Sequence, residues 1–296
     1  MTLRPLSSLL LLCATLGLPA AWAGPVLDRI ASSKRMVLAH RESSVPFSYL
    51  NAEGRPVGYA MDLCLRLVDA VRRQLKADKL DLAYLPVNGS TRIDAIAQGK
   101  ADLECGSTTN NAERRQKVAF TVPHFIAGAR FLVRADSAVV DLPGFEGKKL
   151  VSTKGTTPLK AVQSANADRL LRINVLEVPD HARGVEMVEK GEADGFVMDD
   201  VLLFGLRASR SDPARLKVVG KFQNIEPLAI MLSRDDPEFK RLVDDEMKRL
   251  IRSREAHALY EKWFLQPIVP RNTALDLPMS YLLKDFWKYP TDQVPF

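Results

Sequence analysis

The sequence predicts an α/β protein made of two similar lobes, and three observations lead to this fold class. Apolar strands alternate with amphipathic helices along most of the chain, the pattern of a mainly parallel sheet covered by helices. A short pattern occurs twice, at residues 93–103 and 185–195: a helix closed by glycine, then Ala-Asp entering a strand. Two long apolar stretches, residues 125–133 and 216–232, are expected to be extended and to cross between the lobes.

The N-terminus predicts a secretory signal peptide over residues 1–23. Arg4 supplies a positive charge, residues 9–18 form an apolar run, and Ala21-Trp22-Ala23 has the form of a cleavage site. The run is too short to span a membrane, and the leucines before Cys13 do not fit a lipoprotein signal. We therefore expect a soluble, exported mature chain that begins near Gly24.

Composition excludes some classes of function. The 42 basic residues exceed the 36 acidic ones only modestly and are interspersed with them, which argues against a nucleic-acid surface. After removal of the signal peptide only Cys64 and Cys105 remain. A bridge between them and two buried free thiols are both compatible with this pattern.

The first half of the chain is expected to begin as strand, helix, strand, helix, strand. Leucines and a valine recur at helical spacing after Met61, which predicts a helix. The other expected elements are a strand at 36–39, a hairpin-like return between Gly54 and Gly58, a strand at 80–84, a short helix capped by Ser90 or Thr91 and closed by Gly99, and a strand at 101–105.

The second half repeats this order. Thr157 is the expected N-cap of a helix whose first residue is Pro158. The other expected elements are a strand at 149–152, a strand from 173 that runs to Asp180-His181, a helix at 201–206, and one amphipathic helix over 237–264.

Residues 105–114 are the most informative stretch, because small polar side chains crowd the turn and an arginine follows. We expect a strand end, a loop and a helix start here. Backbone N–H groups, hydroxyls and the Arg114 guanidinium could together bind a small anion. A helix start capped by Ser, Thr or Asn is the alternative interpretation.

No catalytic or metal site is predicted, and no cofactor. The four histidines are scattered, and the chain has no phosphate-binding loop, dinucleotide fingerprint or nucleophile elbow. What remains is a set of polar loops after strands, with Asp199 as an opposite charge. Cationic clamps for carboxylates together with one acidic group describe a site for an α-amino acid. The loop residues are His40-Arg41, Ser90-Thr91-Arg92, Ser107 to Arg114, Gly155 to Thr157 and His181.

The chain resembles the type 3 family of bacterial extracellular solute-binding proteins, and within it the periplasmic glutamate/aspartate-binding branch that serves ABC importers. The resemblance covers nearly the whole mature chain, in order. It is carried by His40 to Tyr49, Gly58-Tyr59 with Asp62, Glu104 to Asn111 with Glu113-Arg114, Gly155-Thr156-Thr157, Asp180-His181, Met198-Asp199-Asp200, Asp235-Asp236-Pro237 and Lys262-Trp263-Phe264.

The resemblance implies a two-lobed periplasmic binding protein-like fold of type II, with a hinge between the lobes. Residues 24–126 and 226–296 would form lobe 1, and residues 127–225 lobe 2. The implied partners are an acidic amino acid and an ABC permease in the inner membrane. The implied protein is a periplasmic monomer whose lobes close around the ligand.

The resemblance also implies roles for single residues. Arg114 would pair with the α-carboxylate of the ligand, helped by Thr109 and Thr157, and Asp199 would accept from the α-ammonium. The other implied contacts are Ser107 and Ser90 as polar contacts, and Arg41, Arg92 and His181 at the side-chain carboxylate. Phe47 would pack on the ligand's methylenes or in the core.

Two departures from the branch and two alternatives remain. The branch pairs a cysteine at position 105 with one near Ile230, which is apolar here, and the turn at residues 86–90 also differs. One alternative is an enzyme resembling cyclohexadienyl dehydratase, with Glu42, Glu104 or Asp199 as the acid. The other is a binding protein for another dicarboxylate or a neutral amino acid, or one whose partner is a sensor.

Overall fold

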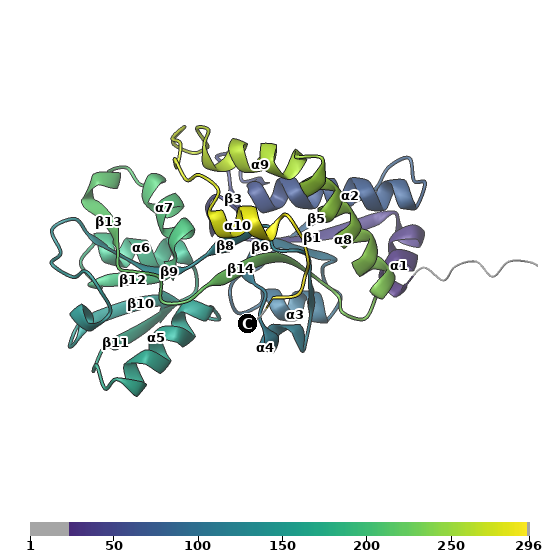
Figure 1. Cartoon of the computed structure of the whole chain (residues 1–296). Helices are drawn as coiled ribbons and strands as arrows, with labels where there is room; N and C mark the ends of the chain where they lie inside the picture. The colour runs from purple at the N-terminus through teal and green to yellow at the C-terminus, as the bar shows by residue number, and fades with distance from the viewer. Residues whose placement is uncertain (1–23, 295–296) are drawn as a thin grey trace, which may run out of the picture.

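The computed structural model describes residues 24–294 and has two α/β lobes, one around each of two twisted sheets (Figure 1). The predicted signal peptide, residues 1–23, lies outside the described residues. Both sheets begin as parallel strands and then add antiparallel ones, as the alternation of strands and helices predicts.

The first sheet has the strand order β5-β1-β6-β14-β7, with β8 also paired to β14. Strand β1 is parallel to both β5 and β6, whereas β14 is antiparallel to β6. These strands are β1 (Arg35–His40), β5 (Asp81–Pro86), β6 (Leu103–Thr109), β7 (Ala119–Phe120), β8 (Phe125–Ala127) and β14 (Glu226–Leu232). The helices of this lobe are α1 (Pro25–Ser33), α2 (Tyr59–Gln74), α3 (Arg92–Ala97), α4 (Ala112–Arg115), α8 (Pro237–Arg252), α9 (Glu255–Phe264) and α10 (Tyr281–Phe286). A small sheet of β2 (Ser43–Ser44), β3 (Ser48–Leu50) and β4 (Pro56–Val57) forms the predicted hairpin-like return.

The second sheet repeats this plan with the order β11-β10-β12-β9-β13. Its strands are β9 (Ala129–Arg134), β10 (Lys149–Thr153), β11 (Asn174–Val178), β12 (Gly195–Asp199) and β13 (Leu216–Val219). Its helices are α5 (Thr157–Asp168), α6 (His181–Glu189) and α7 (Asp200–Ala208), with 3-10 turns η1 (Pro143–Phe145) and η2 (Pro213–Arg215).

The repeated Ala-Asp pattern has the same structural role in both lobes. Asp102 accepts a hydrogen bond from the backbone N–H of Val37 in β1 at 2.7 Å. Asp194 accepts one from the backbone N–H of Lys149 in β10 at 2.8 Å. Each aspartate therefore fixes the start of the neighbouring parallel strand, and the carboxyl ends of the strands of each sheet are aligned beside the other lobe.

The chain crosses from one sheet to the other twice, and the two crossings lie close together. Strand β8 belongs to the first sheet and β9 to the second, with only Gly128 between them. A Cβ at Gly128 would lie 2.5 Å from the ring of Phe222, so this crossing passes close to the second one. The return segment joins β13 to β14 through residues 220–225, and β14 pairs with β8 beside the first crossing (Figure 1).

The predicted single helix over 237–264 is wrong. The chain forms α8 and α9 instead, because Arg254 adopts a left-handed conformation with φ 65° and turns the second helix away. This turn brings Tyr260 and Phe264 against Phe125, with ring centroids 5.9 and 5.0 Å from it. Phe47 belongs to the same cluster: it is fully buried and its ring lies 5.3 Å from that of Phe125. Phe47 therefore packs in the core, which is one of the two positions predicted for it.

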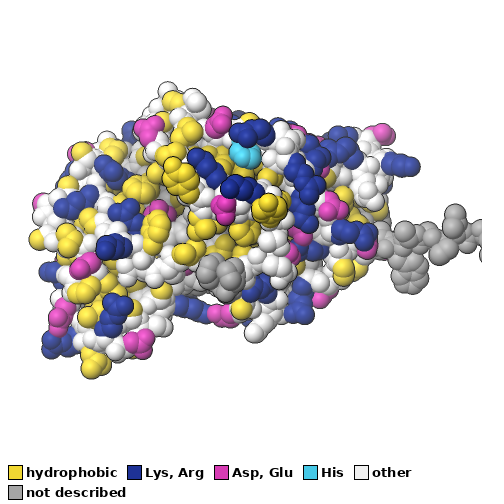
Figure 2. Space-filling view, viewed as in Figure 1, with side chains coloured by type: hydrophobic (Ala, Val, Ile, Leu, Met, Phe, Trp, Pro, Cys, Tyr) yellow, Lys and Arg dark blue, Asp and Glu magenta, His cyan; other side chains and the backbone are white. Residues whose placement is uncertain are grey.

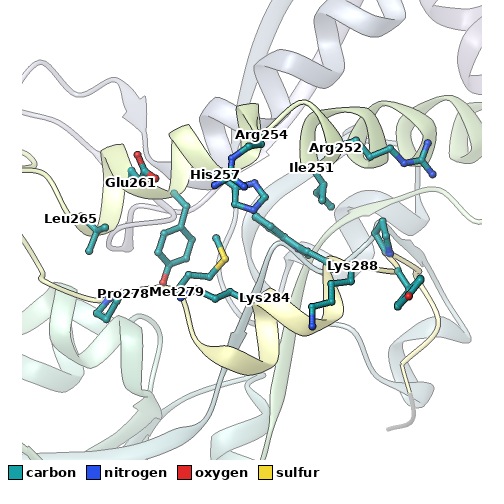
Figure 3. Close-up of a pocket in the computed structure, with 14 residues that line it drawn as sticks. Ile251, Arg252, Arg254, His257, Glu261, Leu265, Pro278, Met279, Lys284 and Lys288 are labelled. Atoms are coloured by element: carbon teal, nitrogen blue, oxygen red, sulfur yellow. The ribbon is translucent and has the colours of Figure 1, made fainter.

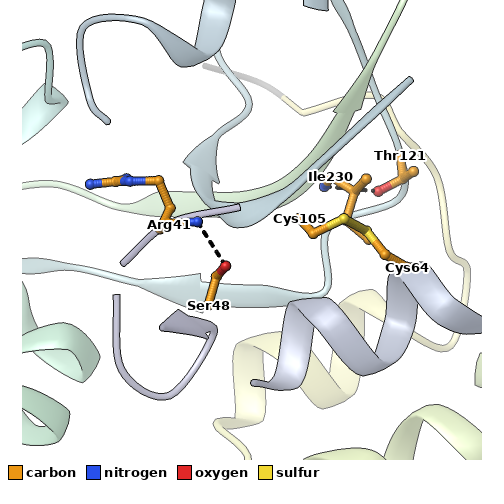
Figure 4. Close-up of a disulfide and its surroundings, with 6 residues drawn as sticks. All are labelled: Arg41, Ser48, Cys64, Cys105, Thr121 and Ile230. Atoms are coloured by element: carbon orange, nitrogen blue, oxygen red, sulfur yellow. Dashed lines mark hydrogen bonds between the residues drawn. A yellow bond between two sulfur atoms is a disulfide. The ribbon is translucent and has the colours of Figure 1, made fainter. Parts of the chain in front are cut away.

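Cys64 and Cys105 form a disulfide with Cα atoms 6.1 Å apart (Figure 4). The bond ties α2 to β6, the strand whose far end carries Ser107 and Thr109. Ile230 of the adjacent strand β14 lies beside the bridge (Figure 4), at a point where the pairing of β14 with β6 is irregular. The bridge therefore forms without a cysteine at position 230.

Candidate functional site

The site lies where the carboxyl ends of the parallel strands of both lobes meet. A small cavity with a volume of about 10 Å³ lies there. Its lining comes from both lobes: Arg92, Ser107, Thr109, Thr156, Thr157, Pro158, His181, Met198, Asp199 and Leu202. Open α/β sheets bind ligands at this edge, because loops and helix N-termini gather there.

Strand β6 is longer than predicted, and this changes how its polar residues are presented. The strand runs to Thr109, because β14 pairs with it as far as Leu228 opposite Thr109. The following helix α4 is capped by Asn111, whose side chain accepts from the N–H of Arg114 at 2.9 Å. Since Asn111 satisfies the helix start, the hydroxyls of Ser107 and Thr109 are free to face the cavity.

At helix α5, too, one residue caps the helix and another faces the site, but the cap lies one residue earlier than predicted. Thr156, not Thr157, is the N-cap and accepts from the N–H of Leu159. Thr157 is therefore the first helical residue, and its hydroxyl points away from the helix axis. It lies 3.1 Å from the hydroxyl of Thr109, so the two threonines join the lobes.

Three arginines reach the site from lobe 1. Arg41 follows β1 and is almost fully buried, with its backbone N–H held by the hydroxyl of Ser48 at 2.9 Å (Figure 4). Arg92 is the first residue of α3 and is also buried. Arg114 donates to the carbonyl of Thr109 at 2.9 Å and, like Arg92, to the carbonyl of Gly155 in lobe 2.

Lobe 2 contributes His181 and Asp199, both buried. Asp180 caps α6, so His181 is the first residue of that helix, and Asp199 ends β12. Arg41 can only donate, so His181 accepts at Nε2 from Arg41 (3.2 Å) and carries its proton on Nδ1, toward Thr153 (2.8 Å). Burial, Arg41 and Arg92 hold the pKa of His181 well below its ordinary value, which agrees with this neutral form.

Glu226 is a site residue that sequence reasoning did not identify. It is the first residue of β14, where the chain returns from lobe 2, and it is 1% exposed. Its carboxylate accepts from the hydroxyl of Thr157 at 2.9 Å and from the amide of Asn224 at 2.5 Å. The sequence holds one clue, an isolated acid at the start of an otherwise apolar strand.

The site contains both buried cations and buried anions, and burial shifts the pKa values of these groups. Burial and the neighbouring Arg92 lower the pKa of Arg41 to about 10 and that of Arg114 to about 9. Burial, Glu226 and Asp200 raise the pKa of Asp199 well above its usual range, and burial raises that of Glu226. A cation bound near Asp199 would favour its charged carboxylate, and anions bound near the arginines would favour their charged guanidinium groups.

Glu104, which belongs to β6, is a third buried carboxylate and lies beneath the arginines of the site. Burial raises its pKa, while Arg92 and Arg41 oppose the rise. A Cβ at Gly106 would lie 2.2 Å from the Glu104 carboxylate and 3.3 Å from Arg41. Glycine at this position therefore lets the carboxylate and the guanidinium stem share the space under the cavity.

Four buried polar atoms of the predicted site residues have no hydrogen-bond partner within residues 24–294. Three belong to donors and one to an acceptor: Arg41 Nη1, Arg92 Nε, Ser107 Oγ and Asp199 Oδ1. Unsatisfied buried polar groups are costly, so a bound ligand that pairs with these four atoms would gain stabilisation from them. The set matches a ligand that has carboxylates on one side and an ammonium on the other.

Six of the nine residues that the sequence predicts line the cavity, and Arg41 and Arg114 lie beside it, bonded to His181 and to the Thr109 carbonyl. Ser90 is exposed and contacts neither the cavity nor these residues, and its backbone N–H donates to Asn88. Within residues 24–294 no group of His, Cys, Asp and Glu is arranged to hold a metal ion. In the same range, no helix is both long and apolar enough to cross a membrane.

Comparisons with known proteins identify the family. The family model of the bacterial extracellular solute-binding proteins, family 3, matches residues 36–266. The L-glutamate/L-aspartate-binding protein of Pseudomonas aeruginosa is 39% identical over 268 residues, 90% of this chain and 89% of the relative. The glutamate/aspartate import solute-binding protein of Escherichia coli is 36% identical over 295 residues, 98% of each chain.

A solved structure shows the same two-lobed fold of type II. It is an ancestral amino acid-binding protein described as a precursor of cyclohexadienyl dehydratase, with a TM-score of 0.68 and 24% identity over 80% of this chain and 98% of that one. With a family model that spans most of the described residues and relatives that align along nearly all of it, the chain belongs to the bacterial extracellular solute-binding proteins, family 3.

Proposed function

We propose that this protein captures L-glutamate and L-aspartate in the periplasm and delivers them to an ABC permease. The observation that carries the proposal is the set of four unsatisfied buried atoms, three donors opposite one carboxylate oxygen. Two relatives with 36% and 39% identity carry names that state glutamate and aspartate binding, and one of these names states import. The predicted signal peptide and the extracellular family support the periplasm as its location.

In the proposed complex, Arg114 holds the α-carboxylate together with the hydroxyls of Thr109 and Thr157. Asp199 accepts from the α-ammonium. Ser107 adds a polar contact to the backbone of the amino acid. The free oxygen of Asp199 and the free hydroxyl of Ser107 support these two assignments.

The side-chain carboxylate of the ligand is proposed to lie between Arg41, Arg92 and His181. Arg41 and Arg92 each keep an unsatisfied N–H, and the Nε2 of His181 is already used by Arg41. His181 therefore fixes Arg41, and the two guanidinium groups select the charge of the ligand. An amide ligand would leave these cations underpaired, which costs about 2–5 kcal/mol for a desolvated pair.

Closure of the lobes is proposed to complete the site. The two β-crossings near Gly128 and residues 220–225 are the proposed hinge, with lobes of residues 24–126 plus 226–296 and residues 127–225. Contacts between Thr109 and Thr157 and between Arg114 and Gly155 support this closure. We propose no catalytic step and a monomer that works with its permease.

Calorimetry on ligand-free protein, unfolded and refolded to remove bound amino acids, tests the proposal. L-glutamate and L-aspartate should bind, and L-glutamine, which differs from glutamate by one neutral amide, should bind roughly 30-fold more weakly or worse. A Lys148→Gln variant, changed on the exposed surface away from the hinge, should bind like the unaltered protein. Tighter binding of glutamine than of glutamate, or no binding of either acid, would overturn the proposed specificity.

A further inference from the structure

A large groove lies outside the amino-acid site. It has a volume of about 960 Å³ and lies between α8, α9 and the C-terminal segment that contains α10 (Figure 3). No residue lines both this groove and the cavity at Asp199. We call it the C-terminal groove.

The floor of the C-terminal groove is aromatic and apolar. Tyr260 and Trp287 are buried, and the indole N–H of Trp287 donates to the carbonyl of Pro123 at 3.0 Å, which fixes the ring. The ring of His257 lies edge-on to Trp287, with centroids 4.9 Å apart. Met279 and Ile251 add aliphatic surface (Figure 3). Such a floor suits an aromatic or aliphatic group.

The rim of the groove is cationic. It carries Arg252, Arg254, Lys284 and Lys288 against one acid, Glu261. Lys288 pairs with Asp285 at 2.9 Å, but no carboxylate of residues 24–294 pairs with the other three cations. Figure 2 shows dark-blue side chains gathered around a hollow on this face.

His257 adds a second sign of an incomplete site. Its Nδ1 is buried and has no hydrogen-bond partner among the described residues. Burial and the charge of Arg254, at the turn between α8 and α9, lower the pKa of His257, and Glu261 opposes them. The groove therefore combines surplus positive charge, a free polar atom and a large apolar floor.

We propose that the C-terminal groove binds a small amphiphilic anion, an aromatic or aliphatic body that carries one carboxylate, sulfonate or phosphate. The body lies on Trp287 and Met279, and the anionic group lies between Arg254 and Lys284. The volume is at the upper end of the range for small-molecule sites, about 300–1,000 Å³. The proposal does not depend on the identity of the amino acid bound in the cleft.

Two fluorescent probes that differ by one charge test the proposal. Anilinonaphthalene sulfonate carries the anionic group, and phenylnaphthylamine is its neutral counterpart. The sulfonate should bind saturably to one site and roughly tenfold more tightly than the neutral probe, from two partly exposed charge contacts. The double variant Arg254→Gln/Lys284→Gln should lose this preference and keep its binding of the neutral probe.

Matched controls separate the groove from other surfaces. Lys148→Gln removes an exposed cation from the other lobe and should keep the preference for the sulfonate. The far-ultraviolet circular dichroism and thermal transition of the double variant should match those of the unaltered protein, which excludes binding of the probes to a partly unfolded state. An equal affinity for the two probes, or a preference that survives the double variant, would refute the proposal.

Competition identifies the source of the anion. Displacement of the sulfonate by decanoate or indole acetate would indicate a free amphiphilic acid. Co-sedimentation with phosphatidylglycerol vesicles, but not with phosphatidylcholine vesicles, would indicate a lipid headgroup. Displacement by L-glutamate alone would place the probe in the amino-acid site and overturn the proposal.

Discussion

Replacing Asp199 by asparagine should remove the recognition of the ligand's ammonium while leaving the cleft intact. Asp199 is buried at the end of β12, and its Oδ1 has no hydrogen-bond partner within residues 24–294. Burial and the nearby Glu226 and Asp200 raise its pKa, so the carboxylate is unfavourable without a cation beside it. Asparagine has nearly the same shape and lacks this charge.

The magnitude follows from loss of one partner of a desolvated charge pair. Such a loss costs about 2–5 kcal/mol, which is roughly a 30- to 5,000-fold rise in the dissociation constant. The loss should appear only for ligands that carry the ammonium. Glutarate, which is glutamate without its amino group, should bind the Asp199→Asn variant at least as well as the unaltered protein.

The stability of the ligand-free protein should change in the opposite direction. A carboxyl group whose folded-state pKa is raised contributes stability that is present at low pH and lost as the pH rises through that pKa. Asparagine does not ionise, so the variant should unfold at an equal or higher temperature than the unaltered protein near neutral pH. Its stability should also depend less on pH above the usual range of aspartate.

Calorimetry with L-glutamate and glutarate, on both proteins, measures the coupling directly. The ratio of the glutarate dissociation constant to the glutamate dissociation constant should fall by the factor above in the variant. A ratio that stays the same, with both ligands weakened equally, would mean that Asp199 supports the cleft and does not contact the ammonium. Asp168→Asn, a change of an exposed acid at the end of α5 in the same lobe, is the matched control and should keep the ratio.

Three further predictions concern other parts of the protein. Arg114→Lys should weaken glutamate binding by about 1.5–3 kcal/mol by calorimetry, because lysine cannot reproduce the forked contact that joins the Thr109 and Gly155 carbonyls to a carboxylate; unchanged affinity would contradict this role. Cys64→Ser should lower the free energy of unfolding in urea by about 4 kcal/mol, since the bridge closes a segment with a sequence separation of 41; a loss equal to that of the unaltered protein measured with reductant confirms the cause. Burial lowers the pKa of His124 to about 3, so its contribution to stability is lost as the pH falls below its unfolded value of 6.5. Between pH 7 and pH 5 this loss should be about 2 kcal/mol, and His124→Phe should abolish that part of the slope in urea unfolding measured at both values.

The sequence predicts those features that depend on local patterns. Alternating strands and helices give the two α/β lobes, and the repeated Ala-Asp pattern gives their similarity, because Asp102 and Asp194 each bind the start of a neighbouring strand. The polar residues at strand ends are also local, so eight of nine predicted side chains fall together. Ser90 lies outside the cavity lining, in a turn whose backbone geometry residue type alone does not determine, and its role in binding stays a prediction.

Features that depend on distant partners are predicted less well. Strand β6 continues to Thr109 only because β14, more than a hundred residues later, pairs with it. The pairing of Cys64 with Cys105 likewise depends on how α2 packs on β6. Thr156 and Thr157 are both acceptable caps by residue type, and only the path of the chain selects Thr156.

Glu226 shows that the site includes a residue outside the polar loops that the sequence identifies. The side chain stands on β14, in lobe 1, yet accepts from Thr157 of lobe 2 and acts on the pKa of Asp199. No local pattern connects these three residues, because the chain between Asp199 and Glu226 leaves the site through α7 and β13 before it returns. The hydrogen bond that Glu226 accepts at this return point therefore requires contact between the lobes, since the hydroxyl that donates it belongs to the other lobe. Residue 226 is the predicted boundary between the lobes. In the structure it is part of the site, and the site is complete only when the lobes are in contact.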